Sequence, residues 1–128
     1  MKFSLETVAD KNYIQSYGSN HIVITSNSHS ETVQLTESVI LSPNQIITDR
    51  QDQTDLELDD SDILLLKSLE PELLIFVSDP TISFLPPEIV VAFNANGIGV
   101  ECMVLAAACR TYNLLVTEGR RVVLVVNF

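Results

Sequence analysis

The sequence contains no tryptophan, four glycines and only two cysteines in 128 residues. Cys102 and Cys109 belong to no Cys-x-x-Cys pair, so the sequence predicts neither a disulfide framework nor a zinc ribbon. We expect both to be free thiols that pack as small hydrophobic side chains in a reducing compartment.

Basic residues are also scarce, because 7 Lys and Arg stand against 17 Asp and Glu, for a formal net charge of −10. Nucleic acids and anionic membranes are bound through clustered Lys and Arg, so neither is expected as a partner.

Long apolar runs are missing too. Glu6 and Asp10 interrupt the first dozen residues, and runs such as Val122–Val126 are far shorter than the ~20 residues of a membrane span. The sequence therefore predicts a cytoplasmic protein without a transmembrane segment.

Hydrophobic residues make up 46% of the chain, which is typical of a globular protein. The length corresponds to one domain, so residues 1–128 are interpreted as a single α/β domain.

The first half of the chain has the pattern of short strands. Segments Tyr13–Tyr17 and His21–Thr25 flank a Gly-Ser-Asn turn and predict an N-terminal β-hairpin. Glu37–Leu41 and Gln45–Thr48 predict two more strands around Ser42-Pro43-Asn44.

An acidic stretch, Asp49–Asp62, follows these strands. It lacks the glycine and the final glutamate of an EF-hand loop, so a solvated loop is the preferred interpretation over a calcium site. The stretch leads into a short helix predicted at Ile63–Lys67, with Asp60 or Ser61 as its N-cap.

The second half alternates between strands and helices. Strands are predicted at Leu73–Val77, Gly99–Met103 and Val122–Val126, with helices from Pro87 to Gly97 and from Ala106 to Glu118. This alternation predicts a three-layer α/β fold with a mixed, mostly parallel central sheet and helices packed on it.

Few sequence patterns indicate chemistry. Gly97-Ile98-Gly99 precedes a strand instead of opening a helix, which argues against a dinucleotide site. Neither a metal site nor a cofactor is predicted.

A polar cluster near the C-terminus is the one candidate site. Glu101 interrupts an otherwise apolar strand, so we expect a buried carboxylate there that needs a partner, which Arg110, Arg120 or Arg121 would supply. Two interpretations remain open, a structural network of ion pairs and caps or a ligand-binding or catalytic site. The cluster consists of Glu101, Arg110, Thr111, Tyr112, Asn113, Glu118 and Arg120.

The segments Gly97–Met103, Ala107–Asn113 and Glu118–Arg120 resemble the adipogenesis-associated Mth-domain family. This family comprises small α/β proteins of bacteria and archaea, with mitochondrial relatives linked to the assembly of respiratory complex I. The resemblance implies a three-layer α/β fold with an added N-terminal β element and no established enzymatic activity. It assigns the shared motif to Glu101, Thr111, Tyr112, Asn113 and Glu118-Gly119-Arg120.

The chain also departs from the family pattern at two places. Val77-Ser78-Asp79 stands where the family usually has Gly-Thr-Gly, and Val104-Leu105 stands where many members have Asp-Thr. Both places follow parallel strands, at the end where α/β sheets bind ligands. An acid replaced by valine cannot serve as an acid, a base or a metal ligand.

Two functions are consistent with these observations. The favoured hypothesis is a non-enzymatic protein that binds other proteins or helps to assemble them. The alternative is a small-molecule-binding or enzymatic domain with a pocket near Glu101, Tyr112 and Asn113, to which Asp79 and Arg110 would contribute. Association of identical chains through exposed edge strands is compatible with both.

Overall fold

The computed structural model describes residues 11–26, 29–48, 60–77 and 85–127. Three strands, β1 (Asn12–Gly18), β2 (His21–Ser26) and β3 (His29–Leu35), form an antiparallel sheet in the order β1-β2-β3. Most of the acidic stretch and Ser78-Asp79 lie outside the described residues.

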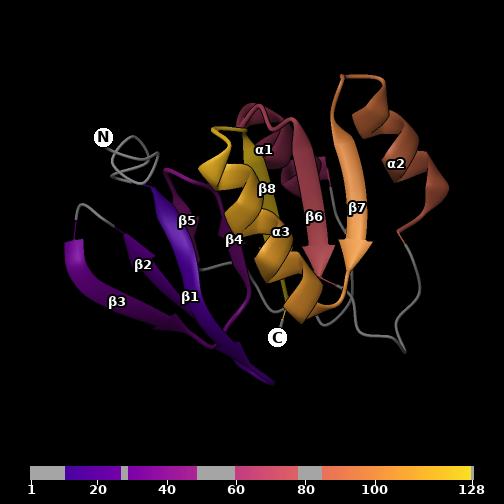
Figure 1. The fold of residues 1–128 in the computed structure, drawn as a ribbon. Coiled ribbons are helices and arrows are strands. Elements are labelled where there is room, and N and C mark those ends of the chain that lie inside the picture. The colour runs from indigo at the N-terminus through magenta and orange to yellow at the C-terminus, as the bar shows by residue number, and fades with distance from the viewer. Residues whose placement is uncertain (1–10, 27–28, 49–59, 78–84, 128) are drawn as a thin grey trace.

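A second sheet of five strands forms the centre of the molecule (Figure 1). Its order is β5-β4-β8-β6-β7, in which β6 pairs parallel with β7 and β8, while β4 pairs antiparallel with β5 and β8. The sheet is therefore mixed. Its strands are β4 (Val39–Leu41), β5 (Ile46–Ile47), β6 (Leu73–Val77), β7 (Gly99–Met103) and β8 (Val122–Val126).

Three helices complete the described fold: α1 (Asp60–Ser68), α2 (Pro87–Asn94) and α3 (Leu105–Thr117). Helix α1 begins at Asp60, so Asp60 and Ser61 lie inside its first turn, and the prediction that one of them is the N-cap is wrong. Gly97 and Gly119 follow α2 and α3 with positive φ of 77° and 76°, the conformation that ends helices and that glycine adopts without strain.

The core divides into two clusters because successive strand residues point to opposite faces of the central sheet. Ile75 and Leu124 pack with α3, β1 and β2 on one face. Leu74, Phe76 and Val123 pack with α1 and α2 on the other face. Figure 1 shows α3 in front of the central sheet and α1 behind it.

Strand β3 was not predicted from the sequence. It lies at the edge of the small sheet, and its exposed residues Thr32, Val33 and Gln34 lack the apolar pattern of a buried strand. No helix within the described ranges has the length and apolar character that crossing a bilayer requires.

Candidate functional site

Tyr112 is fully buried on α3 and connects this helix to β1. Its side chain has 0% relative exposure, and its hydroxyl donates a hydrogen bond of 3.0 Å to the backbone oxygen of Asn12. Burial raises the pKa of Tyr112 far above its ordinary value, with a smaller contribution from nearby Tyr13. The hydroxyl therefore stays protonated and serves as a hydrogen-bond donor.

Asn113 makes a matched pair of hydrogen bonds with a single residue of β1. Its side-chain oxygen accepts from the Ile14 N–H at 2.9 Å, and its side-chain nitrogen donates to the Ile14 carbonyl at 2.9 Å. A neighbouring strand would satisfy the same two backbone groups in the same way. The amide of Asn113 thus replaces a strand along the outer edge of β1.

Together, Tyr112 and Asn113 close this edge over one turn of helix. The Asn12 N–H is also satisfied, because it donates to the carbonyl of Pro43 at 2.8 Å. Behind Tyr112, Cys109 is 2% exposed, and burial raises the pKa of its thiol to about 11 although Arg110 acts in the opposite direction. Cys109 is therefore a protonated core side chain and not a nucleophile.

Glu101 does not join this cluster. Its side chain is exposed on β7, the edge strand of the central sheet, so the prediction of a buried carboxylate is wrong. The apolar residues around Glu101 suggested burial on both faces, but an edge strand is open to solvent. Arg110 is also exposed, and Thr111 is half-buried.

The glycine-containing end of the motif binds a different carboxylate. Arg120 pairs with Glu72 at 3.3 Å and Arg121 pairs with it at 3.6 Å, while Glu118 is the exposed C-cap of α3. The backbone N–H of Arg121, helped by the two guanidinium groups, lowers the pKa of Glu72 against a smaller effect of desolvation. The expected ion pairs thus form with Glu72 in place of Glu101.

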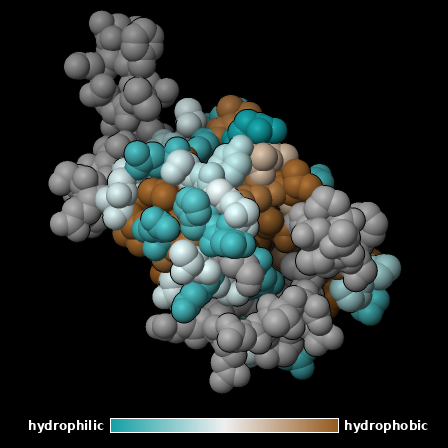
Figure 2. Space-filling model, turned by 90° about the horizontal axis from the view of Figure 1, so that it is seen from below, coloured by the Kyte–Doolittle hydropathy of each residue, from teal (hydrophilic) through white to brown (hydrophobic). Residues whose placement is uncertain are grey.

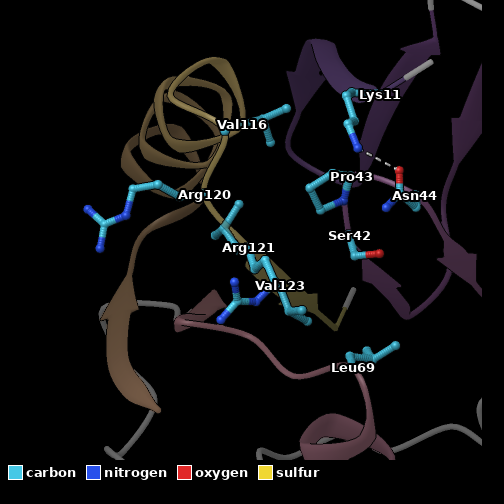
Figure 3. A pocket seen from close by; sticks show the side chains of 11 residues that line it. Lys11, Ser42, Pro43, Asn44, Leu69, Val116, Arg120, Arg121 and Val123 are labelled. Carbon is cyan, nitrogen blue, oxygen red and sulfur yellow. Dashed lines mark hydrogen bonds between the residues drawn. The ribbon is translucent and has the colours of Figure 1, made fainter. Parts of the chain in front are cut away.

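A small pocket lies at this end of α3 (Figure 3). Its volume is about 150 Å³, and its lining includes Lys11, Pro43, Val116 and Arg120. Lys11 donates to the side-chain oxygen of Asn44 at 3.0 Å, and the side chain of Arg120 points away from the hollow. Lys11 is thus bonded to another lining residue, and Arg120 and Arg121 pair with Glu72, which is not in the lining. Glu101, Tyr112 and Asn113 are not part of the lining either.

The opposite end of the central sheet is apolar where β6 and β7 finish. Val77 and Met103 end these strands, and Val104, which is 45% exposed, leads into α3. Val104 occupies the N-cap position of α3, where no side chain bonds to the free backbone N–H groups. Figure 2 views the molecule from this end and shows hydrophobic side chains at the surface among hydrophilic ones.

The structure brings together only part of the predicted cluster. Tyr112 and Asn113 act as one unit, Arg120 belongs to a separate ion-pair site, and Glu101 lies on β7 across α3 from β1 (Figure 1). Their partners Asn12, Ile14 and Glu72 were missed, since each contact joins segments at least 48 positions apart and no local pattern marks it. Within the described ranges, no three His, Cys, Asp or Glu side chains lie close enough to hold a metal ion.

Comparison with known families gives one match. The family described as a protein of unknown function, DUF498/DUF598, matches residues 14–126. No curated protein matches the chain.

Solved structures share the fold along nearly the whole chain. A Bordetella parapertussis protein is 30% identical with a TM-score of 0.73, covering 93% of this chain and 97% of that one. A Bartonella henselae structure described as an outer membrane protein is 24% identical with a TM-score of 0.70, covering 91% of this chain and 94% of its own. A Bordetella pertussis protein described as a Mth938-like domain is 24% identical with a TM-score of 0.66, covering 91% and 85%.

Proposed function

The chain belongs to the DUF498/DUF598 family, and on that premise we propose that it is a non-enzymatic protein that binds another protein and assists its assembly. The observation that carries the proposal is the exposed, uncapped Val104 at the carboxyl ends of the parallel strands. Ligands of α/β sheets bind at this end, and here the exposed residue is apolar.

Val104 makes α3 less stable than a capping residue at this position would. An Asp, Asn or Ser at an N-cap stabilises a helix by about 0.5–2 kcal/mol relative to an apolar residue. The chain instead exposes a valine beside Met103 and Val77, both of which are half-buried. A desolvated apolar contact with a partner protein is a function for which valine suits this position better than a capping residue.

The polar motif supports the same proposal. The Tyr112 hydroxyl and both ends of the Asn113 amide are bonded to β1, so these groups act in holding the fold together. No feature of the pocket beside Arg120 favours the alternative of a small-molecule or catalytic site near Glu101.

Assembly of other proteins, rather than simple binding, rests on the resemblance to the Mth-domain family and its mitochondrial relatives. A cytoplasmic location is part of the proposal and is supported by the two free cysteines, Cys102 and Cys109. The proposal assumes a three-layer domain in which α3 and the small sheet lie on one face of the central sheet and α1 and α2 lie on the other.

The test compares Val104→Asp with Leu114→Asp. Asp at position 104 provides the missing N-cap, so this variant should fold at least as well as the wild type while presenting a charge to the partner. Leu114 is 58% exposed further along α3 and serves as the matched control. After crosslinking in the native cells and affinity purification, the wild type and Leu114→Asp should recover the same partner, and Val104→Asp should lose most of it.

Two results would contradict the proposal. One is recovery of the chain alone under crosslinking, and the other is equal recovery of the partner by Val104→Asp and the wild type.

A further inference from the structure

The described sheets have four outer strands, and three of them are protected against pairing with another strand. Tyr112 and Asn113 bond to the first residues of β1, at Asn12 and Ile14, while β5 has only two residues and β7 carries the exposed carboxylate of Glu101. Helices or side chains over an edge, short edge strands and exposed charges are common means of preventing edge-to-edge association.

Strand β3 is not short, no helix of the described residues bonds along its outer side, and its one charged residue is Glu31. It is seven residues long, pairs with β2 on one side and, among the residues that the structure describes, pairs with no strand on the other. Figure 1 places it at the outer margin of the small sheet. Its last four residues, Thr32–Leu35, carry no charge.

The hydrogen bonds of β1 identify the backbone groups that β3 presents outward. The N–H and C=O of Ile14 point to Asn113, away from β2, so those of the opposite residue Ile24 point toward β3. Val33 lies opposite Ile24 and takes up those bonds. The backbone groups of the adjacent residues Thr32 and Gln34 therefore point away from the sheet.

The side chains of β3 continue the apolar face of the small sheet. Val33 stands opposite Ile24 and Leu35 opposite Ile22, and both β2 residues are fully buried. Val33 nevertheless remains 44% exposed, because it lies on the outer strand of the small sheet and no described strand covers its far side. A further strand alongside β3 would cover Val33 and pair the outward-pointing groups of Thr32 and Gln34.

We propose that this strand is β3 of a second copy of the chain, paired antiparallel across a two-fold axis to form a continuous six-stranded sheet. Charge decides in favour of a second copy. The protein carries a net charge of −10, yet residues 12–30 contain no Asp, Glu, Lys or Arg, and Glu31 is the one charged residue in β3. The stretch Thr32–Leu35, which bears the outward backbone groups, has no charge with which to select an oppositely charged strand.

The two acids at the far side of the central sheet add little repulsion to this pairing. Helix α2 and strand β7, which carry Glu88 and Glu101, lie on the opposite side of the molecule from β3 in Figure 1, so two copies joined through β3 keep these two carboxylates far apart. Repulsion over such distances is screened by physiological salt, with a Debye length of about 8 Å. The interface is isologous, as in most dimers. It is distinct from the proposed partner surface at Val104.

Proline substitutions provide the test, measured on the full chain by sedimentation equilibrium from micromolar to near-millimolar concentration. Thr32→Pro removes an outward N–H and leaves the bonds to β2 intact, since proline is tolerated at an edge when its nitrogen faces outward. The wild type should form a dimer, and Thr32→Pro should dissociate at least about tenfold more readily, equivalent to about 1.4 kcal/mol. The matched control Val33→Pro removes an inward N–H and should instead disrupt the small sheet.

Hydrogen exchange gives a second measurement that requires no variant. The amides of Thr32 and Gln34 should become more protected as the concentration rises, whereas that of Val33 should not change. If Thr32→Pro fails to fold, Thr32→Lys replaces it, because two lysines near the dyad repel each other without altering the backbone. A wild type that stays monomeric throughout, including one that takes up a strand of another protein, overturns the proposal, as does an unaltered dimer in the folded variant.

Discussion

The two outer edges of the small sheet differ in whether their outward backbone groups are hydrogen-bonded. Along β1, the side chains of Tyr112 and Asn113 on α3 satisfy the carbonyl of Asn12 and both backbone groups of Ile14. Along β3, the outward groups of Thr32 and Gln34 have no bond to any other described residue. The contrast shows that Tyr112 and Asn113 bond to the outer edge of β1, whereas no described residue bonds to the outward groups of Thr32 and Gln34 on β3.

Replacing Tyr112 should have the largest effect on the closed edge. Tyr112→Ala removes a fully buried aromatic ring as well as the bond to Asn12, so the free energy of unfolding should fall by about 3–5 kcal/mol. Tyr112→Phe keeps the ring and should reduce it by only about 1 kcal/mol. Urea denaturation measures both. Equal losses in the two variants would show that the hydroxyl, and not packing, holds β1.

Replacing Asn113 should open the β1 edge with a smaller loss in the free energy of unfolding. Asn113→Leu leaves the Ile14 N–H and C=O without partners and should reduce the free energy of unfolding by about 2 kcal/mol. The Ile14 amide should lose protection from hydrogen exchange. Cys109, which is buried in the same helix, should react faster with a thiol reagent at neutral pH.

The control for Asn113→Leu is Leu114→Ala, an exposed neighbour that should alter stability by no more than about 0.5 kcal/mol. Wild-type protection of Ile14 in Asn113→Leu would mean that the amide does not close the edge. Asn113→Leu should also self-associate more strongly than the wild type, because the outer edges of both β1 and β3 would then be available to pair with another copy.

The smallest effect is expected at the far end of α3, where Arg120 holds Glu72. The folded pKa of Glu72 is below its ordinary 4.5, so its stabilising contribution is present above that pH and is lost as the pH falls through the folded pKa. Glu72→Gln should therefore reduce the difference in urea midpoint between pH 7 and pH 3. Because the pair is exposed, salt should weaken the effect. Identical midpoint differences in both proteins would contradict this.

Local patterns were sufficient for the central sheet. The runs Leu73–Val77, Gly99–Met103 and Val122–Val126 coincide with β6, β7 and β8, and the two interior strands β6 and β8 are apolar throughout because both of their faces are covered. Gly97 and Gly119 mark the ends of their helices since the backbone there requires positive φ. Edges follow other rules, which is why β3 was missed and Glu101 was wrongly expected to be buried.

The candidate site was less predictable than the fold. Tyr112 and Asn113 were identified as a motif, yet their role depends on backbone groups of Asn12 and Ile14, which any residue type would supply. Sequence spacing carries no signal for a side chain that bonds to a backbone about a hundred positions away. The ion pairs of Arg120 and Arg121 with Glu72 were assigned to the wrong acid for the same reason.

The bonds between Asn113 and Ile14 also determine the order in which the chain can fold. They join residues 99 positions apart, so β1 leaves the ribosome long before the helix that closes its edge exists. At synthesis rates of about 5–20 residues per second, the interval is roughly 5–20 s. During that time the backbone groups of Asn12 and Ile14 lack the side chains that later bond to them, so this edge of the nascent hairpin is open until α3 emerges.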